Sequence, residues 1–128
     1  MLRLYRDQAC QDEITQNSPD FFEKAVLAGG TLTDVAELYI KSDDSEATYK
    51  NIYITGIGDE DSASESGEID ILYSADGSNY VQELNIPDGE YTTPLKIYRK
   101  AIAPAVTKRF NRVDIKHELG QDEYEKRR

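Results

Sequence analysis

The sequence predicts an all-β protein, built as an antiparallel sandwich or barrel, and three observations support this. Short runs that alternate apolar and polar residues recur along the chain, a pattern typical of half-buried strands. Turn-forming groups such as Gly29-Gly30 and Pro87-Asp88-Gly89 separate these runs. The chain has 128 residues, which is the size of one domain and is enough to bury a core without metals or disulfides.

In the first half of the chain, the alternating runs cover residues 2–5, 31–41 and 49–55. The second run is the clearest, because Leu38 and Ile40 point to one face and Tyr39 to the other. Between the first two runs, residues 20–28 fit either a return of the chain to the core or a short helix that ends at Gly29-Gly30.

In the second half, the alternating runs cover residues 68–73, 80–86, 95–101 and 110–119. The first two flank the sequence Ser74-Ala75-Asp76-Gly77-Ser78, which predicts a tight hairpin. Gly77 would supply the positive φ that such a turn needs. Tyr73 and Tyr80 on the two arms would then pair across the hairpin or face the core.

Two stretches do not read as core. Residues 58–67 are acidic and rich in serine, which predicts an exposed loop. Residues 120–128 are charged and lack apolar spacing, which predicts a tail. We therefore expect a sandwich of about seven to eight strands over residues 1–119, followed by a charged extension over residues 120–128.

The charge balance limits the partners. Asp and Glu outnumber Lys and Arg by 25 to 15, for a net charge of −10. Such a charge repels nucleic acid and anionic membranes, so neither is an expected partner. The first seven residues form no apolar signal core, and no run approaches the length of a membrane span, so synthesis in the cytoplasm is expected.

Catalytic residues are scarce in the sequence. His117 is the only histidine and shares the parity of Val113 and Ile115, which favours a strand residue over a catalytic one. Cys10 is the only cysteine and has no basic neighbour in sequence to activate it. Neither phosphate-cradling glycine motif is present. We therefore expect no enzymatic activity, although a small hydrolase stays open as a minor alternative.

No cofactor or metal is expected. One histidine and one cysteine cannot build a closed zinc site without carboxylates. Asp59, Asp61 and Glu65 lie close together in the acidic loop, which leaves calcium open. The loop nevertheless departs from the EF-hand pattern, because its sixth position is Ser64 where that pattern has glycine.

The remaining signal concerns surfaces that could bind a protein. The chain has nine tyrosines and no tryptophan, and basic residues gather in its last third. Tyrosines on the polar faces of strands suit a half-exposed sheet and equally suit a protein interface. The candidate interface residues are Tyr39, Tyr53, Tyr98, Lys108, Arg109, Arg112, Lys126, Arg127 and Arg128.

Four segments resemble small immunoglobulin-like accessory proteins of tailed bacteriophages. They are LYRDQACQDEIT, TLTDVAELYIKSDDSEATYKNIYI, IDILYSADGSNYVQEL and TPLKIYRKAIAPAVTKRFNRVDIKHEL, which together cover most of residues 4–119. In that family the Ser-x-Asp-Gly-Ser turn joins two strands, and residues 93–104 match the penultimate strand. The acidic loop and the basic C-terminus depart from many relatives.

The resemblance implies a non-enzymatic structural component of a virion. We expect it to decorate or stabilise the capsid, with a tail or neck accessory role as the alternative. Its partners would be other virion proteins, either the major capsid protein or tail proteins, and self-association stays open. A module that binds a carbohydrate or a cell surface is the alternative from another class, and the lack of tryptophan disfavours it.

Overall fold

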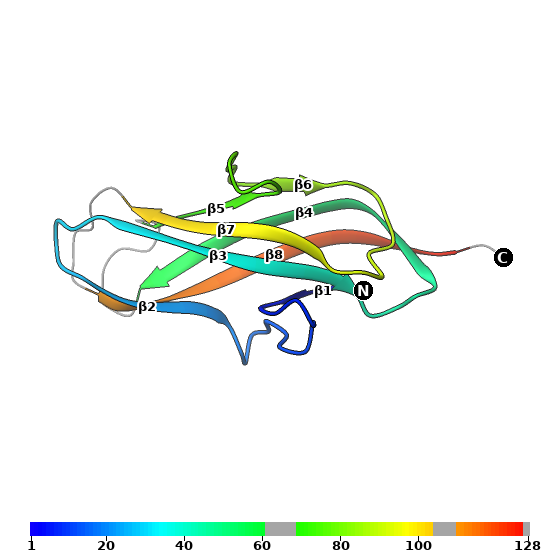
Figure 1. The fold of residues 1–128 in the computed structure, drawn as a ribbon, viewed down its shortest axis with the longest axis horizontal. Coiled ribbons are helices and arrows are strands. Elements are labelled where there is room, and N and C mark those ends of the chain that lie inside the picture. Colours follow the sequence, from blue (N-terminus) through cyan, green and yellow to red (C-terminus); the bar gives the residue numbers. More distant parts are fainter. Residues whose placement is uncertain (61–68, 104–109, 127–128) are drawn as a thin grey trace.

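The computed structural model describes residues 1–60, 69–103 and 110–126, and these form two antiparallel four-stranded sheets that pack together as a β-sandwich (Figure 1). The strands are β1 (Leu2–Tyr5), β2 (Asp20–Val26), β3 (Leu32–Ser42), β4 (Ala47–Glu60), β5 (Asp70–Ser74), β6 (Leu84–Ile86), β7 (Leu95–Ala103) and β8 (Phe110–Glu125). One sheet, sheet A, has the order β1-β3-β7-β5, and the other, sheet B, has the order β2-β8-β4-β6. The predicted all-β sandwich is confirmed at this level.

The core lies between the sheets and follows the alternation in the sequence. In β3, Leu38 and Ile40 point inward, and in β7 Ile97 and Ala101 do so, and all four are almost fully buried. Their neighbours in sequence point outward, because successive side chains of a strand alternate between its two faces. One set of apolar residues is thereby buried against the opposite sheet, which is the main source of stability for such a fold.

A β-bulge at Asn51 changes the parity of β4. The pairing with β8 shifts between Lys50 and Tyr53, and Asn51 has a φ of 52°. Before the bulge Tyr49 points into the core, and after it Ile52 and Ile54 do. The extra residue keeps the apolar side chains of both halves of this long strand on the core side.

Residues 20–28 contain a strand, so the helical alternative for this segment is wrong. β2 pairs with the start of β8, where Phe22 lies opposite Val113. Phe22 is buried on the core side, whereas Phe21 on the other side is 42% exposed. Alternation with a period of two fits a half-buried strand, where neighbouring side chains point about 180° apart, whereas a helix would separate them by only about 100°.

The predicted hairpin is only partly formed. Gly77 has a φ of +81°, as the turn prediction requires, and Tyr73 exchanges two backbone hydrogen bonds with Val81. The chain then crosses to sheet B, where β6 covers only three residues and pairs with β4. The predicted strand over residues 80–86 is therefore wrong in its first half, where Gln82 and Glu83 are exposed.

β8 is longer than the sequence suggests. It continues to Glu125, and its last residues pair with the start of β4, where Ala47 lies opposite Glu125. The predicted boundary after Leu119 therefore falls inside a strand, and only residues 127 and 128 follow the part of the chain described here. In the described residues, no helix has the length and apolar character needed to cross a membrane.

Candidate functional site

Five polar side chains meet between the two sheets, each on a different strand. They are Asp20 on β2, Asp34 on β3, Tyr73 on β5, Arg99 on β7 and His117 on β8. We call them the inter-sheet cluster. Three come from sheet A and two from sheet B, so the contacts between them join the layers of the sandwich.

The cluster is a continuous chain of hydrogen bonds. The Tyr73 hydroxyl lies 2.6 Å from Nδ1 of His117, and Nε2 of His117 lies 2.8 Å from Oδ2 of Asp20. Arg99 then donates from Nε to the same Asp20 oxygen at 3.1 Å and from Nη1 to Oδ2 of Asp34 at 2.7 Å. This series of hydrogen bonds passes from one sheet to the other twice, once between Tyr73 and His117 and once between Asp20 and Arg99.

Arg99 is the most unusual member because it is a charged residue that is 1% exposed. Moving a guanidinium from water into the protein interior costs roughly several kcal/mol of free energy unless the group is paired and hydrogen-bonded there. Asp20 and Asp34 supply that pairing, and the Phe22 ring lies 5.5 Å from the guanidinium carbon. Removing either partner would leave a buried charge, so these residues depend on one another.

Gly56 makes room for the Tyr73 hydroxyl. It lies on β4 directly opposite His117 on β8. A Cβ atom at position 56 would lie 2.1 Å from the hydroxyl oxygen of Tyr73, well inside any allowed contact. The absence of a side chain there lets a tyrosine from sheet A reach a histidine in sheet B.

Two groups in the cluster have shifted pKa values. Burial alone would raise the pKa of Asp20, but the hydrogen bond with His117 and the charge of Arg99 outweigh this and lower it. Burial, with the nearby charge of Asp20, raises the pKa of the Tyr73 hydroxyl far above its usual value. Asp20 is therefore ionised and Tyr73 protonated at neutral pH.

The partners of the two ring nitrogens then indicate which tautomer of His117 is favoured. Asp20 can only accept, so the Nε2–H of His117 donates to it, and the Tyr73 hydroxyl donates to Nδ1. Both ring nitrogens have partners within the protein, and the imidazole side chain is only 3% exposed. The cluster is chemically suited to holding the sheets together.

A groove of about 630 Å³ runs between β1 and β8 and reaches one side of His117. The carboxamide of Gln121 bridges these strands, accepting from the Leu2 N–H at 2.6 Å and donating to the Leu2 carbonyl at 3.1 Å. Because both His117 nitrogens already bond to Tyr73 and Asp20, the ring offers no free nitrogen to the groove.

The sequence prediction missed most of this cluster. It identified His117 as a strand residue with the parity of Val113 and Ile115, and that placement is confirmed. Arg99 gives the clearest unused signal, because it shares the parity of Leu95 and Ile97, which point to the core. A charged residue at a core position predicts buried partners of opposite sign.

The three tyrosines of the candidate interface lie on opposite sides of the molecule. Tyr39 and Tyr98 are on the outward side of sheet A, where Tyr39 is only 9% exposed and Tyr98 is partly buried. Tyr53 points outward from sheet B, where its ring covers Gly120 so closely that a Cβ there would lie 2.1 Å from it. The structure therefore brings Tyr39 and Tyr98 together and separates Tyr53 from them.

The basic residues of the candidate interface are also spread out. Arg112 lies near the start of β8 and stacks on the Phe21 ring at 3.9 Å. Lys126 follows the other end of this strand, on the order of 50 Å away, where it contacts Glu90. Lys108, Arg109, Arg127 and Arg128 lie outside the described residues, as do Asp61 and Glu65 of the acidic loop.

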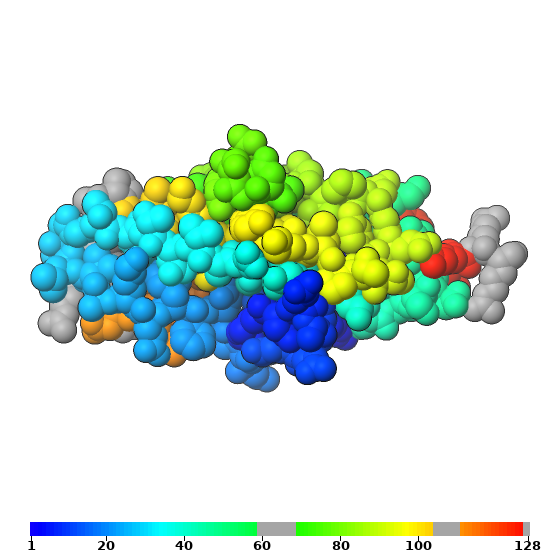
Figure 2. All heavy atoms as spheres, viewed as in Figure 1, coloured from blue at the N-terminus to red at the C-terminus, as the bar shows by residue number. Residues whose placement is uncertain are grey.

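The outward side of sheet A forms a surface that we call the tyrosine face. Its residues are Arg3, Tyr5, Thr33, Val35, Glu37, Tyr39, Lys41, Asp70, Leu72, Lys96, Tyr98, Lys100 and Ile102. The strand register sets them in rows, with Tyr39 between Tyr5 and Lys96, and Lys100 between Val35 and Leu72. The cyan atoms of β3 run across this side in Figure 2.

Two tyrosine rings, that of Tyr98 on this surface and that of Tyr80 beside it, each have a lysine above them. Lys96 Nζ lies 5.4 Å from the centre of the Tyr98 ring, and Lys100 Nζ lies 5.0 Å from that of Tyr80. Behind Tyr98 lies the Asp76-Gly77 turn, where a Cβ on Gly77 would be 3.3 Å from the ring. Asp76 holds that turn by accepting from the N–H groups of Ser78 and Asn79. This turn therefore supports the tyrosine face.

The described part of the chain holds no group of three or more His, Cys, Asp or Glu side chains placed to bind a metal ion. Cys10 lies in the loop after β1, with its Sγ 3.7 Å from the carbonyl oxygen of Gln8, and burial raises the pKa of its thiol. A raised pKa makes a thiol less reactive at neutral pH.

Comparison with known proteins gives no relative. No family model, curated protein or solved structure matches the chain.

Proposed function

We propose that the chain is a non-enzymatic structural component of a virion, an immunoglobulin-like β-sandwich that binds another virion protein. The favoured position is the capsid surface, and a tail or neck position is the alternative. The observation that supports the proposal is the tyrosine face, where the exposed Val35 and the partly buried Tyr5, Leu72, Tyr98 and Ile102 stand on the outward side of sheet A. Tyrosine provides large contact area and a hydrogen-bonding group, as protein interfaces require.

The inter-sheet cluster supports a structural role over a catalytic one. Its histidine, two carboxylates and tyrosine are bound to one another and to Arg99, and Tyr73 is fully buried. A general base must reach a substrate within hydrogen-bonding distance. These groups instead link five strands, which suits a domain that must stay folded on the outside of a particle.

The geometry disfavours the carbohydrate-binding alternative. A sugar stacks on an open aromatic ring, but the Tyr98 ring lies between the Gly77 turn and the Lys96 ammonium. Lys100 lies in the same way over Tyr80. A sugar would have to displace both lysines before it could stack on these rings.

Co-sedimentation with particles tests the proposal. Purified protein is mixed with particles that lack it and spun through a sucrose cushion, with an unrelated acidic β-sandwich of similar size as the control. We expect the protein to pellet with the particles and to saturate at a fixed ratio to the major capsid protein or to a tail protein. A protein that stays in the supernatant at all concentrations would contradict the proposal.

A further inference from the structure

We propose that the tyrosine face docks on an acidic protein surface. This inference rests on the proposed function and adds the surface used and the chemistry of the partner. Other features of the described chain are less suited to an acidic partner, because Glu13 and Asp114 line the groove beside β1 and the inter-sheet cluster is closed.

The charge of this face is opposite to that of the whole chain. The cations Lys41, Lys96 and Lys100 stand there with the carboxylates of Glu37 and Asp70, whereas Arg3 is already paired with Asp43 and Glu13. The chain as a whole has 15 Lys and Arg against 25 Asp and Glu. An acidic partner would be attracted to this side and repelled by the rest of the surface, which also orients the encounter.

The face also has apolar area between its charges. Val35 is 52% exposed, and it lies in one row with Lys100 and the partly buried Leu72. Ile102 stands in the next row, opposite Thr33. A patch of aliphatic and tyrosine side chains with lysines among them matches a protein surface whose carboxylates surround an apolar centre.

Nucleic acid fits this face less well than an acidic protein. Glu37 lies 3.9 Å from Lys96 and accepts from the Tyr39 hydroxyl, so it sets a negative charge within the basic row. A phosphate backbone would meet this carboxylate and the net charge of −10 together. A protein partner can place a hydrogen-bond donor opposite Glu37.

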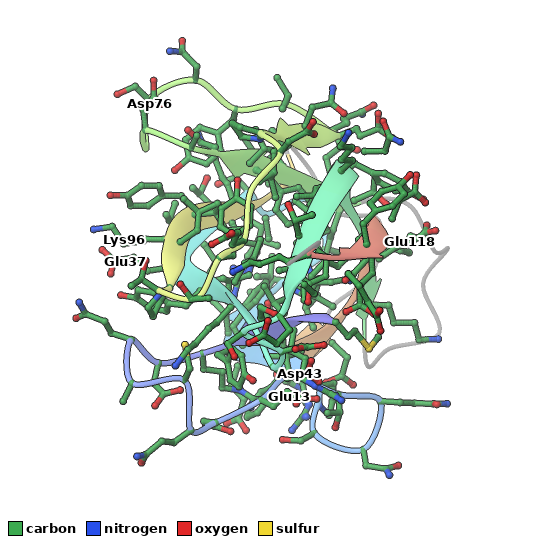
Figure 3. The ribbon with its side chains drawn as sticks, turned by 90° about the vertical axis from the view of Figure 1, so that its right-hand side faces the viewer. Glu13, Glu37, Asp43, Asp76, Lys96 and Glu118 are labelled. Atoms are coloured by element: carbon green, nitrogen blue, oxygen red, sulfur yellow. The ribbon has the colours of Figure 1, made fainter. Side chains whose placement is uncertain are left out.

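Two charge-reversal variants distinguish binding through the tyrosine face from binding through the opposite side of the sandwich. Lys96→Glu with Lys100→Glu alters the tyrosine face, and Lys50→Glu with Lys116→Glu makes the same charge change on the outward side of sheet B. Lys96 lies on one flank of the molecule, and Glu118, on the same side of β8 as Lys116, lies on the opposite flank (Figure 3). Val35→Ser tests the apolar centre without changing the charge.

In the particle assay we expect K96E/K100E to lower affinity about tenfold or more, and K50E/K116E to change it less than about twofold. Val35→Ser should weaken binding several-fold without changing its salt dependence, because it removes contact area alone. Equal binding by wild type and K96E/K100E would overturn this inference and leave the proposed function standing.

A second measurement needs no particle. Wild-type protein labelled with ¹⁵N is titrated with a decapeptide of alternating Glu and Leu and, separately, with a short DNA duplex. We expect the peptide to shift the amide signals of Val35, Tyr39, Lys96 and Tyr98, and the duplex to bind at least tenfold more weakly. Shifts on sheet B alone, or stronger binding of the duplex, would overturn the inference. Shifts on this face without particle binding would overturn only the proposed function.

Discussion

The hydroxyl oxygen of Tyr73 lies 2.6 Å from Nδ1 of His117, which links the two sheets of the sandwich through its centre. The two rings meet edge to face, with their centres 5.6 Å apart. This contact completes a chain of side chains from Tyr73 through His117 and Asp20 to Arg99. The stability of the protein should therefore depend on these side chains, although a buried histidine bonded to an aspartate could also be taken for part of a catalytic site.

Tyr73→Phe removes the hydroxyl and leaves Nδ1 of His117 buried without a partner. We expect a loss of about 1–2 kcal/mol in the free energy of unfolding, the usual cost of an unsatisfied buried group. Urea denaturation followed by circular dichroism measures it. Tyr80→Phe on the surface is the control and should change stability little. Equal stability of the two variants would show that the Tyr73 hydroxyl contributes nothing to holding the sheets.

Gly56→Ala places a Cβ where the Tyr73 hydroxyl now lies, at 2.1 Å. We expect a loss of about 2 kcal/mol or more, since a rigid core cannot shift far enough to relieve this contact. Gly58→Ala is the matched control on the same strand, because its nearest contact would be 3.3 Å. Adding Tyr73→Phe to Gly56→Ala should recover part of the loss. Additive losses in the double variant would show that the two positions are not in contact.

The lowered pKa of Asp20 predicts a loss of stability in acid. A carboxylate whose folded pKa is depressed stabilises the protein above its unfolded pKa of about 3.9, and this stabilisation disappears as the pH falls through the folded value. Unfolding midpoints measured from pH 6 to pH 2.5 should therefore fall less steeply for Asp20→Asn than for wild type. Glu118→Gln on the surface is the control. Parallel curves for wild type and Asp20→Asn would contradict the predicted role.

The glycines at positions 77 and 29 allow the Tyr98 contact to be isolated. Both have a φ near +80°, but a Cβ on Gly29 meets nothing within 4 Å, whereas one on Gly77 lies 3.3 Å from the Tyr98 ring. Alanine at either position should cost about 1 kcal/mol from backbone strain. We expect Gly77→Ala to lower the melting temperature more than Gly29→Ala does. The reverse order would show that the ring moves aside at no cost.

The fold was predictable from the sequence because alternation identifies strands directly. The strands at residues 2–5, 31–41 and 95–101 agree with β1, β3 and β7 to within two residues at each end. The late part of β8 could not be found in this way. Residues 120–125 are mostly charged, and they form a strand because β4 pairs beside them, a contact between segments far apart in the sequence.

The candidate site was less predictable, for a related reason. Arg99 and His117 show core parity in the sequence, but Asp20 and Asp34 resemble ordinary polar residues until the sheets are packed. Gly56 likewise gives no sign in sequence that it faces Tyr73. Which side chains meet across a sandwich depends on how its two sheets are stacked, and local pattern carries no such information.

The central claim is that the cluster stabilises the protein while the tyrosine face binds its partner. The most direct test measures particle affinity and melting temperature together for Tyr73→Phe and for K96E/K100E. We expect Tyr73→Phe to melt several degrees lower and bind as wild type does at a temperature where it is folded. K96E/K100E should melt within a few degrees of wild type and lose about tenfold or more in affinity. A folded Tyr73→Phe that no longer binds particles, with K96E/K100E binding normally, would contradict the account.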